Sequence, residues 1–186
     1  MFWVWLYLVV FALFDLIFVT LAIEMFAAKV RREAPEVPSS AHLRAAVISE
    51  IRKHYSDAKT VLDIGSCYGG MARIIARNFP KMRVLGTERM PLPFTFSKIA
   101  RIFWREKNVN FRFGDAFRFI KKSDGYDIGT AYLLTPMMPR VESVADKFRV
   151  LLVLDFPLPN RRPTRKFKLH KDLLGQHWLY VYENKV

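Results

Sequence analysis

The sequence is poor in the residue types that build disulfides and metal sites. It has 186 residues and one cysteine, Cys67, which excludes an intrachain disulfide and any zinc site built on a cysteine cluster. Its four histidines (His42, His54, His170 and His177) show no metal-ligand spacing, so we expect no metal site. Acidic residues are also scarce, 17 against 30 lysines and arginines, which gives a formal net charge of +13. This excess favours an anionic partner, which could be nucleic acid, an anionic membrane leaflet or an acidic protein.

No basic residue precedes the apolar run that opens the chain, residues 1–23. At about 1.5 Å per residue, the run is long enough to cross the roughly 30 Å of bilayer hydrocarbon. The main alternative is a cleaved signal peptide, which normally has a basic start and a shorter apolar part. Lys29, Arg31 and Arg32 follow the run, and basic residues favour the cytoplasmic side of a membrane. We therefore predict a retained single-pass transmembrane anchor over residues 1–24, with the rest of the chain on the cytoplasmic or topologically equivalent side.

Charges within and after the run bear on the same prediction. Asp15 lies inside the run, where a charge near the bilayer midplane costs about 2.5–3.5 kcal/mol, so it would pair with another helix or lie nearer the interface. The basic residues after the run are expected to contact anionic lipid headgroups, at about 1 kcal/mol each. Residues 25–40, which include the proline-rich stretch EAPEVPSS, are predicted to be a juxtamembrane linker to a domain formed by residues 41–186.

The stretch TVLDIGSCYGG, residues 60–70, changes abruptly from an apolar run with one acid to small residues. This pattern is typical of a buried parallel strand, a tight turn and the start of a helix. The G-x-G-x-x-G spacing of dinucleotide sites is absent. The stretch resembles instead motif I of the class I S-adenosylmethionine (SAM) methyltransferases, [VL]-[LV]-D-[IV]-G-x-G-x-G. Asp63, Gly65 and Gly69 match this motif, and Cys67 stands at its middle glycine; the alternative is an ordinary strand–helix turn of an α/β protein.

Helical and strand patterns alternate over the rest of the chain. This alternation predicts an α/β, Rossmann-like fold with a mostly parallel twisted sheet, helices on both faces and a C-terminal antiparallel hairpin. The resemblance to motif I implies that it is the fold of the class I methyltransferases. The predicted helices are 41–55, 71–79, 94–104 and 141–147, the predicted strands are 60–64, 82–88, 109–113, 126–134 and 149–155, and the hairpin pairs 165–169 with 178–182.

Acids at strand ends complete the predicted cofactor site. Glu88 closes the second strand, where nucleoside-binding α/β folds place an acid that accepts hydrogen bonds from the ribose hydroxyls; the alternative is an exposed acid at a strand end. The resemblance implies that Asp115, beside Ala116, holds the adenine amino group, whereas Phe117 either contacts the purine or lies in the core. The SAM-binding residues that follow from these interpretations are Asp63, Gly65, Ser66, Cys67, Gly69, Glu88, Asp115, Ala116 and Phe117.

The order of several short motifs along the chain points to one family within the class I methyltransferases. The chain resembles the membrane-anchored protein-lysine methyltransferases that modify the c subunit of ATP synthase and the adenine nucleotide translocase, with their prokaryotic relatives. These proteins have an N-terminal transmembrane helix, P-F-V-P-[ST], D-[LI]-G-S-G-D-G-R, an acid closing strand two, a P-x-M-M-like segment and F-P-[LF]-P. The resemblance covers nearly the whole chain, and the matching segments occur in the same order: residues 35–39, 63–66, Glu88, 135–138 and 156–159. The chain departs from the pattern at Glu36, in place of an aromatic residue, and at residues 67–70, which read CYGG in place of G-D-G-R.

The resemblance implies SAM-dependent N-methylation of a lysine in a membrane-associated protein. Methyl transfer to an amine requires a neutral amine, and lysine loses its proton more readily in an apolar or electronegative pocket, so no catalytic base is assigned. The loop after the fourth strand lacks the N-P-P-[YF] motif of many nucleic-acid methyltransferases, so nucleic acid is not an expected partner. Pro38, Tyr132, Thr135, Pro136 and Met137 are predicted to line a channel for an alkyl side chain; the alternative for the methionines is core packing.

Two other functions are compatible with the sequence. One is a methyltransferase for a lipid or small hydrophobic molecule, and the other is a non-catalytic, membrane-tethered module that binds a partner and SAM. An RNA methyltransferase fits less well because of the anchor. The enzyme hypothesis requires the turn at Cys67 to bind SAM. If Cys67 merely fills a glycine position, a Cys67→Gly substitution should preserve or improve SAM affinity. The same substitution is predicted to reduce stability by roughly 0.4–1 kcal/mol through the entropy of the unfolded chain.

Overall fold

The computed structural model describes residues 1–30, 39–172 and 175–184. The chain divides into two compact units, Met1–Glu36 and Val37–Val186. The boundary between them falls in the segment 25–40 that the sequence predicts to be a linker. Pro38, which was predicted to line the substrate channel, lies outside the described residues.

The first unit contains one long helix, α1, which runs from Phe2 to Val30 and includes residues 2–24 of the predicted membrane anchor. Its segment Phe2–Thr20 has a mean hydropathy of 2.4 and is long and apolar enough to cross a membrane. The Thr20 hydroxyl donates a hydrogen bond to the Leu16 carbonyl at 2.6 Å, which satisfies this polar group inside the helix. A signal sequence near an N-terminus can have the same length and composition.

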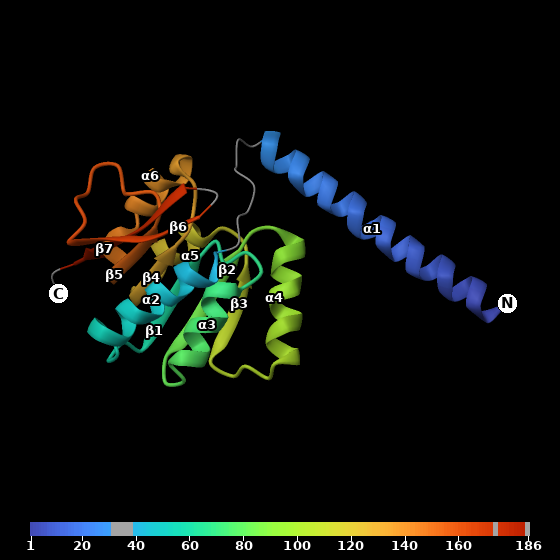
Figure 1. Ribbon diagram of the computed structural model, residues 1–186, viewed down its shortest axis with the longest axis horizontal. Coiled ribbons are helices and arrows are strands. Elements are labelled where there is room, and N and C mark those ends of the chain that lie inside the picture. The colour runs from blue at the N-terminus through green and yellow to red at the C-terminus, as the bar shows by residue number, and fades with distance from the viewer. Residues whose placement is uncertain (31–38, 173–174, 185–186) are drawn as a thin grey trace. The chain divides into compact units, whose positions relative to one another are not determined.

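The second unit is built on one seven-stranded sheet in the order β3-β2-β1-β4-β5-β7-β6 (Figure 1). Five strands are parallel: β1 (Thr60–Ile64), β2 (Arg83–Glu88), β3 (Val109–Phe113), β4 (Tyr126–Ala131) and β5 (Phe148–Leu154). The hairpin of β6 (Arg165–Asp172) and β7 (Gly175–Glu183) adds antiparallel strands beside β5. The predicted Rossmann-like methyltransferase fold, including its C-terminal hairpin, is confirmed.

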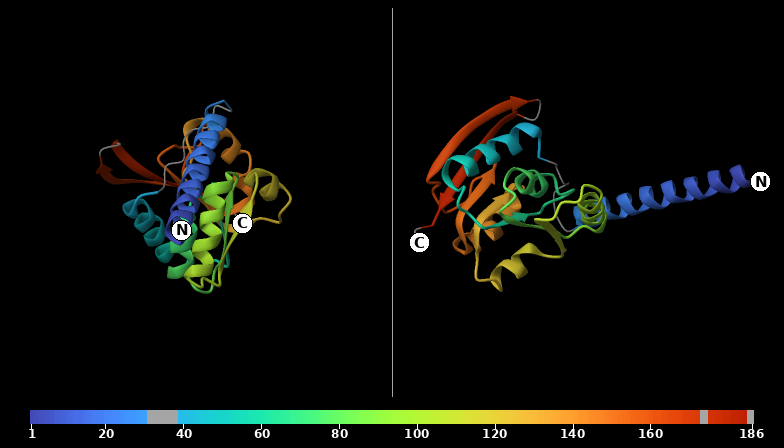
Figure 2. Two further views of the ribbon diagram at one scale, coloured as in Figure 1. Left: turned by 90° about the vertical axis from the view of Figure 1, so that its right-hand side faces the viewer. Right: turned by 90° about the horizontal axis from the view of Figure 1, so that it is seen from below.

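Helices cover both faces of this sheet (Figure 2). The elements that precede β4 are α2 (Ala41–His54), α3 (Gly70–Asn78), α4 (Pro91–Phe103) and α5 (Ala116–Lys121). Those between β4 and β5 are the 3-10 helix η1 (Thr135–Met137), α6 (Met138–Glu142) and the 3-10 helix η2 (Ala145–Lys147). Helices α2 and α3 pack on one face, whereas α5 and α6 pack on the other.

The strands divide their side chains between two core clusters. On β5, Val150 and Leu152 belong to the cluster under α2 and α3, whereas Leu151 and Val153 belong to the cluster under α5 and α6. Successive side chains of a strand point to opposite faces, so a strand that is covered on both sides is apolar at every position. This burial on both faces explains the unbroken apolar run of β5 from residue 150 to residue 154, which follows the half-buried Arg149.

Some element boundaries differ from the predicted ones, and prolines account for several of the differences. Helix α4 begins at Pro91 rather than at residue 94, and α6 has Pro139 in its first turn, where the missing proline N–H costs nothing. The predicted helix 141–147 is thereby replaced by α6 and η2, and β4 ends at Ala131 rather than at residue 134.

An ion-pair network holds α2 against the hairpin. Arg165 on β6 donates to the Glu50 carboxylate on α2 at 2.7 Å and to Glu183 on β7 at 3.2 Å. The same guanidinium donates to the Tyr55 hydroxyl at 2.6 Å. Glu50 is buried, and buried charged groups in proteins are normally paired and hydrogen-bonded, as this one is. The network fixes the orientation of α2, whose first turns carry residues of the functional site described next.

Candidate functional site

The turn between β1 and α3 requires glycine at two positions. Gly65 has a φ of +70°, and a Cβ there would lie 2.7 Å from Cδ2 of Leu133. Gly69 has a φ of +76°, and a Cβ there would lie 2.6 Å from Cζ of Phe111. Both values of φ lie in the left-handed region that glycine tolerates best. The turn therefore has the conformation for which motif I provides glycines.

Cys67 also adopts a left-handed conformation, with a φ of +50°, at the position of the motif's middle glycine. This conformation costs a non-glycine residue about 1–2 kcal/mol. Relief of this cost in Cys67→Gly outweighs the predicted loss of about 0.4–1 kcal/mol through the unfolded chain. The sequence-based expectation of lower stability is therefore reversed: we expect Cys67→Gly to unfold at a higher denaturant concentration than the unsubstituted protein.

A matched variant isolates the backbone contribution at this position. Cys67→Ser keeps a Cβ of similar size and therefore keeps the cost of the positive φ. Chemical denaturation should place Cys67→Ser close to the unsubstituted protein and Cys67→Gly above both. Equal stability of the glycine and serine variants would show that the turn does not strain residue 67.

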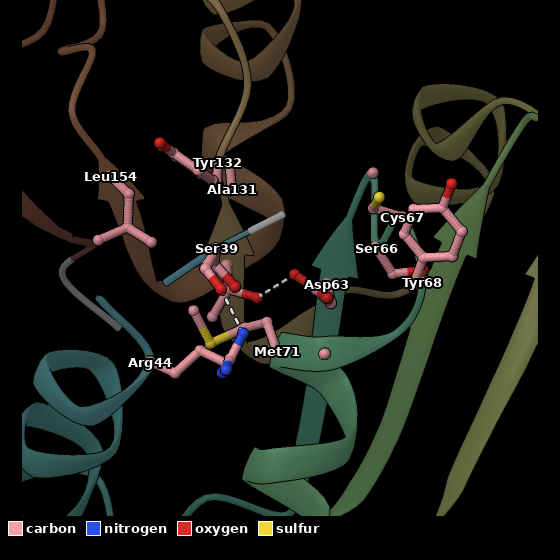
Figure 3. A pocket seen from close by; sticks show the side chains of 13 residues that line it. Ser39, Arg44, Asp63, Ser66, Cys67, Tyr68, Met71, Ala131, Tyr132 and Leu154 are labelled. Atoms are coloured by element: carbon pink, nitrogen blue, oxygen red, sulfur yellow. Dashed lines mark hydrogen bonds between the residues drawn. The ribbon is translucent and has the colours of Figure 1, made fainter. Parts of the chain in front are cut away.

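A cavity of about 180 Å³ lies at the carboxyl ends of β1 and β4, beside this turn (Figure 3). In Figure 3 the side chains of Tyr132 and Leu154 lie on one side of Asp63, and those of Cys67 and Tyr68 lie on the other. A second cavity, of about 60 Å³, lies at the ends of β2 and β3 and is lined by Glu88, Asp115, Ala116 and Phe117, among others. Gly65 lines both cavities, so they meet at the glycine turn.

Asp63 places a carboxyl group with one unpaired oxygen at the first cavity. Its side chain is buried, and its Oδ1 accepts a hydrogen bond from the Thr130 hydroxyl at 2.7 Å. Its Oδ2 is buried and has no hydrogen-bond partner among the residues that the structure describes. Burial raises the pKa of Asp63 to about 6, against the lowering effects of Thr130 and the Ala72 amide, and the nearby Glu88 charge adds to the rise. A cationic group at Oδ2 would relieve this desolvation.

Arg44 is a residue of the same cavity that the motif analysis missed. It extends from the first turns of α2, and its Nη1 donates a hydrogen bond to the Ser39 carbonyl. A Cβ at Gly70 would lie 3.4 Å from the same Nη1. Position 70 is where the motif G-D-G-R has its arginine, so Arg44 brings a guanidinium from another element to this place. A signal was present in the sequence, because Arg44 occupies the apolar stripe of its helix, three and four residues before Val47 and Ile48.

Glu88 is buried at the end of β2 and holds the turn together. Its Oε2 accepts a hydrogen bond from the Cys67 amide at 2.8 Å. Its Oε1 accepts from the amides of Arg89, at 2.6 Å, and of Met90, at 2.8 Å. The alternative of an exposed acid at a strand end is therefore wrong. A ribose bound at Glu88 would donate to a carboxylate that already accepts hydrogen bonds from the backbone amides of Cys67, Arg89 and Met90.

These hydrogen bonds predict two effects of substituting Glu88. Glu88→Ala leaves three backbone amides without their acceptor and should lower the free energy of unfolding by about 1–3 kcal/mol, so the variant is not a clean binding probe. Glu88→Gln keeps one acceptor oxygen and should be less destabilising. If Glu88 binds ribose, calorimetric titration of the folded glutamine variant should give weaker SAM binding. Unchanged affinity in that variant would exclude the ribose role.

Asp115 and Phe117 lie together in the second cavity, and a third residue joins them. Asp115 Oδ1 caps α5 by accepting from the Phe117 amide at 3.0 Å, and Oδ2 pairs with Arg140 at 2.7 Å. Burial would raise the pKa of Asp115, but Arg140 and the Phe117 amide outweigh it and lower the pKa. The Arg140 guanidinium carbon also lies 4.3 Å from the centre of the Phe117 ring. A purine bound at this place would contact the Asp115 carboxylate and the Phe117 ring, both of which already contact Arg140. The sequence did not indicate that Arg140 belongs to this cavity.

The residues predicted to line a substrate channel do not lie together in one cavity. Tyr132 lines the first cavity, whereas Met137 lines the second. Thr135 and Pro136 are exposed in η1. Met138 is fully buried in the core, which matches the core-packing alternative for that methionine. Among the described residues, no group of three or more histidine, cysteine, aspartate or glutamate side chains could hold a metal ion.

No known protein-family profile and no curated protein matches this sequence. Solved structures do match it. An RNA methyltransferase from Salinibacter ruber, in complex with S-adenosyl-L-homocysteine, has a TM-score of 0.63 and 22% identity, over 79% of this chain and 93% of its own. A putative O-methyltransferase from Klebsiella pneumoniae has a TM-score of 0.66 and 15% identity, over 81% and 84%. A precorrin-6y C5,15-methyltransferase from Geobacter metallireducens GS-15 has a TM-score of 0.62 and 13% identity, over 82% and 93%. At these identities the similarity is one of fold.

Proposed function

We propose that this protein is a SAM-dependent methyltransferase that is anchored in a membrane by α1 and methylates a lysine of a membrane-associated protein. The observation that carries the proposal is the pair of opposite charges in the first cavity. Asp63 and Arg44 both line it, beside the glycine turn. The amino-acid end of SAM carries one ammonium and one carboxylate group, so this cavity is complementary to it in charge.

The residues around the two cavities fit the whole cofactor. The unpaired Oδ2 of Asp63 is suited to accept from the ammonium group, and the Arg44 guanidinium to donate to the carboxylate. Glu88 and Asp115, in the second cavity, are suited to hold the nucleoside end, and Gly65 lies between the two ends. The fold neighbour from Salinibacter ruber contains the demethylated product of the same cofactor.

When bound, SAM supplies a methyl group on a positively charged sulfur. The role of the chain is to hold the acceptor amine close, neutral and in line. Met71, Tyr132 and Leu154 give the first cavity a largely apolar wall. Burial in such surroundings lowers the pKa of a lysine amine and favours the neutral form that attacks. The same apolar wall suits the alkyl part of a lysine side chain, and no nucleophilic residue of the chain is required.

Helix α1 supports the proposed location in a membrane. A segment of 19 residues with a mean hydropathy of 2.4 is suited to anchor the protein. Three basic residues follow this segment in the sequence: Lys29, Arg31 and Arg32, of which the two arginines lie outside the described residues. Basic residues on this side of the segment favour a cytoplasmic position for the second unit and contact with anionic lipid headgroups. Sequencing of the N-terminus of the membrane-extracted protein tests the anchor: the original start is expected, and a start near residue 28 would contradict it.

The transfer itself is tested by incubating membranes that contain the full chain with SAM labelled on its methyl group. We expect label in protein, on lysine after hydrolysis, and none in membranes that contain an Asp63→Asn, Arg44→Met double variant. Label in the lipid fraction would instead support methylation of a lipid or small hydrophobic molecule, for which the apolar wall of the cavity is equally suited. Absence of both label and SAM binding, with the protein folded by circular dichroism, would overturn the enzyme proposal.

A further inference from the structure

Helix α4, which lies beside β3 at the end of the sheet (Figure 1), is apolar on its outer side as well as its inner side. Pro93 and Ser97 are buried on its inner side, where the Ser97 hydroxyl donates a hydrogen bond to the Cys67 carbonyl at 2.9 Å. On the other side are the side chains that we call the α4 apolar face: Phe96, Ile99, Ile102, Phe103 and the following Trp104. Their exposed fractions are 52%, 57%, 70%, 74% and 60%. Single exposed apolar residues are common on protein surfaces, but five within residues 96–104 form a contiguous patch of the kind that marks an interaction site.

The charges around this face are almost all positive. Lys98, Arg101, Arg105 and Lys107 lie within or directly after α4. The one acid among residues 91–107 is Glu106, and its carboxylate is already paired with Arg73 at 2.7 Å and Arg77 at 2.6 Å. The Arg77 guanidinium carbon also lies 5.4 Å from the centre of the Trp104 ring. The surface thus combines large apolar side chains with a basic border, which is complementary to lipid acyl chains beneath anionic headgroups.

We propose that the α4 apolar face inserts into the interfacial region of an anionic bilayer and so provides a second membrane contact besides α1. The composition favours lipid over RNA, because Ile99 and Ile102 have no flat face on which a base could stack. Phe103 and Trp104 meet edge to face, at 5.2 Å and 85°, rather than as two open parallel platforms. A second copy of the chain fits less well, since it would bring two basic borders together.

The α4 apolar face adjoins the first cavity through an aromatic contact. Tyr68 lines the first cavity, and its ring meets the Phe96 ring edge on at 5.9 Å. Insertion of the α4 apolar face would therefore hold the rim of the cavity at the bilayer surface. A substrate group would then reach the cavity from the interface rather than from bulk water. The membrane contact itself depends on neither the transfer chemistry nor the anchor.

The test uses the full chain in Cys67→Gly form, which removes the single native cysteine. A nitroxide probe is attached to one new cysteine at a time, by Phe103→Cys or Ile99→Cys on the face, or Arg118→Cys as a control on the exposed side of α5. Phe14→Cys reports separately on insertion of α1, where this side chain is 71% exposed. Each protein is placed in nanodiscs of phosphatidylcholine with or without phosphatidylserine, and its collision rates with apolar oxygen and a polar nickel complex are compared.

The expected result is a several-fold higher ratio of oxygen to nickel collisions at positions 99 and 103 than at 118, in phosphatidylserine nanodiscs and less so without this lipid. Raising the salt from about 0.1 to 1 M shortens the screening length from about 10 to 3 Å and should reduce the difference between the two lipid compositions. If α1 fails to insert, the same comparison with vesicles added to the protein still tests the face. Equal ratios at 99, 103 and 118 would overturn the proposal. So would protection that depends on protein concentration rather than lipid, which indicates a second copy, or protection by added RNA alone.

Discussion

Replacement of Asp63 by asparagine is expected to raise the stability of the protein and to weaken its SAM binding at the same time. The two effects have one physical cause, a buried carboxylate with an unpaired oxygen. In the absence of a ligand, its charge is poorly solvated and costs free energy. With a cationic group at Oδ2, the same charge contributes to binding.

The sign of the stability effect follows from the pKa of Asp63, which is about 6 in the folded protein. The pKa in the unfolded chain is about 3.9, so the folded state binds more protons than the unfolded state between these values. The free energy of unfolding therefore falls as pH rises from about 4 to about 6, and the penalty is complete above that range. At about 1.4 kcal/mol per pKa unit, the penalty is about 2–3 kcal/mol. Asp63→Asn should recover much of it at pH 8 and almost none at pH 4.

Chemical denaturation at pH 4 and pH 8 measures this difference, and Asp127→Asn is the matched control. Asp127 accepts hydrogen bonds from the Lys59 and Thr60 amides, both at 2.8 Å. Burial tends to raise its pKa, but these amides and the Thr60 hydroxyl outweigh burial and lower it. Its charge therefore stabilises the fold above the unfolded pKa, and this contribution is lost as pH falls. Asp127→Asn should accordingly reduce stability at pH 8.

SAM binding by the same variants completes the test. Loss of a hydrogen bond to a charged group costs about 1.5–3 kcal/mol, which is roughly ten- to hundredfold in affinity. Calorimetric titration should show this loss for Asp63→Asn and little change for Asp127→Asn. A stable Asp63→Asn protein with full affinity would remove Asp63 from the site, and a variant destabilised at pH 8 would contradict the raised pKa.

The sequence predicted best those features that depend on residues close together in the chain. The turn from Gly65 to Gly69 is such a feature, because its two glycines, its acid and its strand are adjacent. Helix α5 was missed although it is local. Its six residues, AFRFIK, are too few to show a helical period, and its N-cap Asp115 was interpreted as a ligand to adenine. Both roles use the same carboxylate, and sequence alone does not separate them.

Contacts between distant segments could not be predicted in this way. Asp115 and Arg140 are separated by 25 residues, and their ion pair depends on how α5 and α6 pack on one face of the sheet. Arg44 and Gly70 belong to different helices, and their proximity depends on the network that fixes α2. For Cys67, the sequence indicated a glycine-like position, but only the φ of +50° shows that the cysteine carries a conformational cost.

Replacement of Arg44 by methionine is expected to weaken SAM binding by about 1.5–3 kcal/mol, roughly ten- to hundredfold, with little effect on the fold. The guanidinium is the cation that this cavity offers to a carboxylate, and methionine keeps much of the apolar stem of the side chain. Arg44→Lys should retain part of the affinity, because an ammonium group is a point charge without the paired donors of arginine. Arg52→Met, on the same helix, is the control, because Arg52 pairs with Asn78 rather than lining the cavity.

A second substitution, at Gly70, tests whether the loss of SAM affinity comes from the missing guanidinium at this place rather than from a change in the structure of α2. Gly70 is the exposed first residue of α3, and a Cβ there points to within 3.4 Å of the Arg44 guanidinium. In an Arg44→Ala protein, Gly70→Arg would bring a guanidinium to the vacated space from the position where the G-D-G-R motif has it. The double variant should regain most of the SAM affinity that Arg44→Ala loses, whereas Gly70→Met in the same background should not. Equal affinities of the arginine and methionine double variants would show that the cavity does not use a cation at this place, and the charge-pair argument for the cofactor site would fail with it.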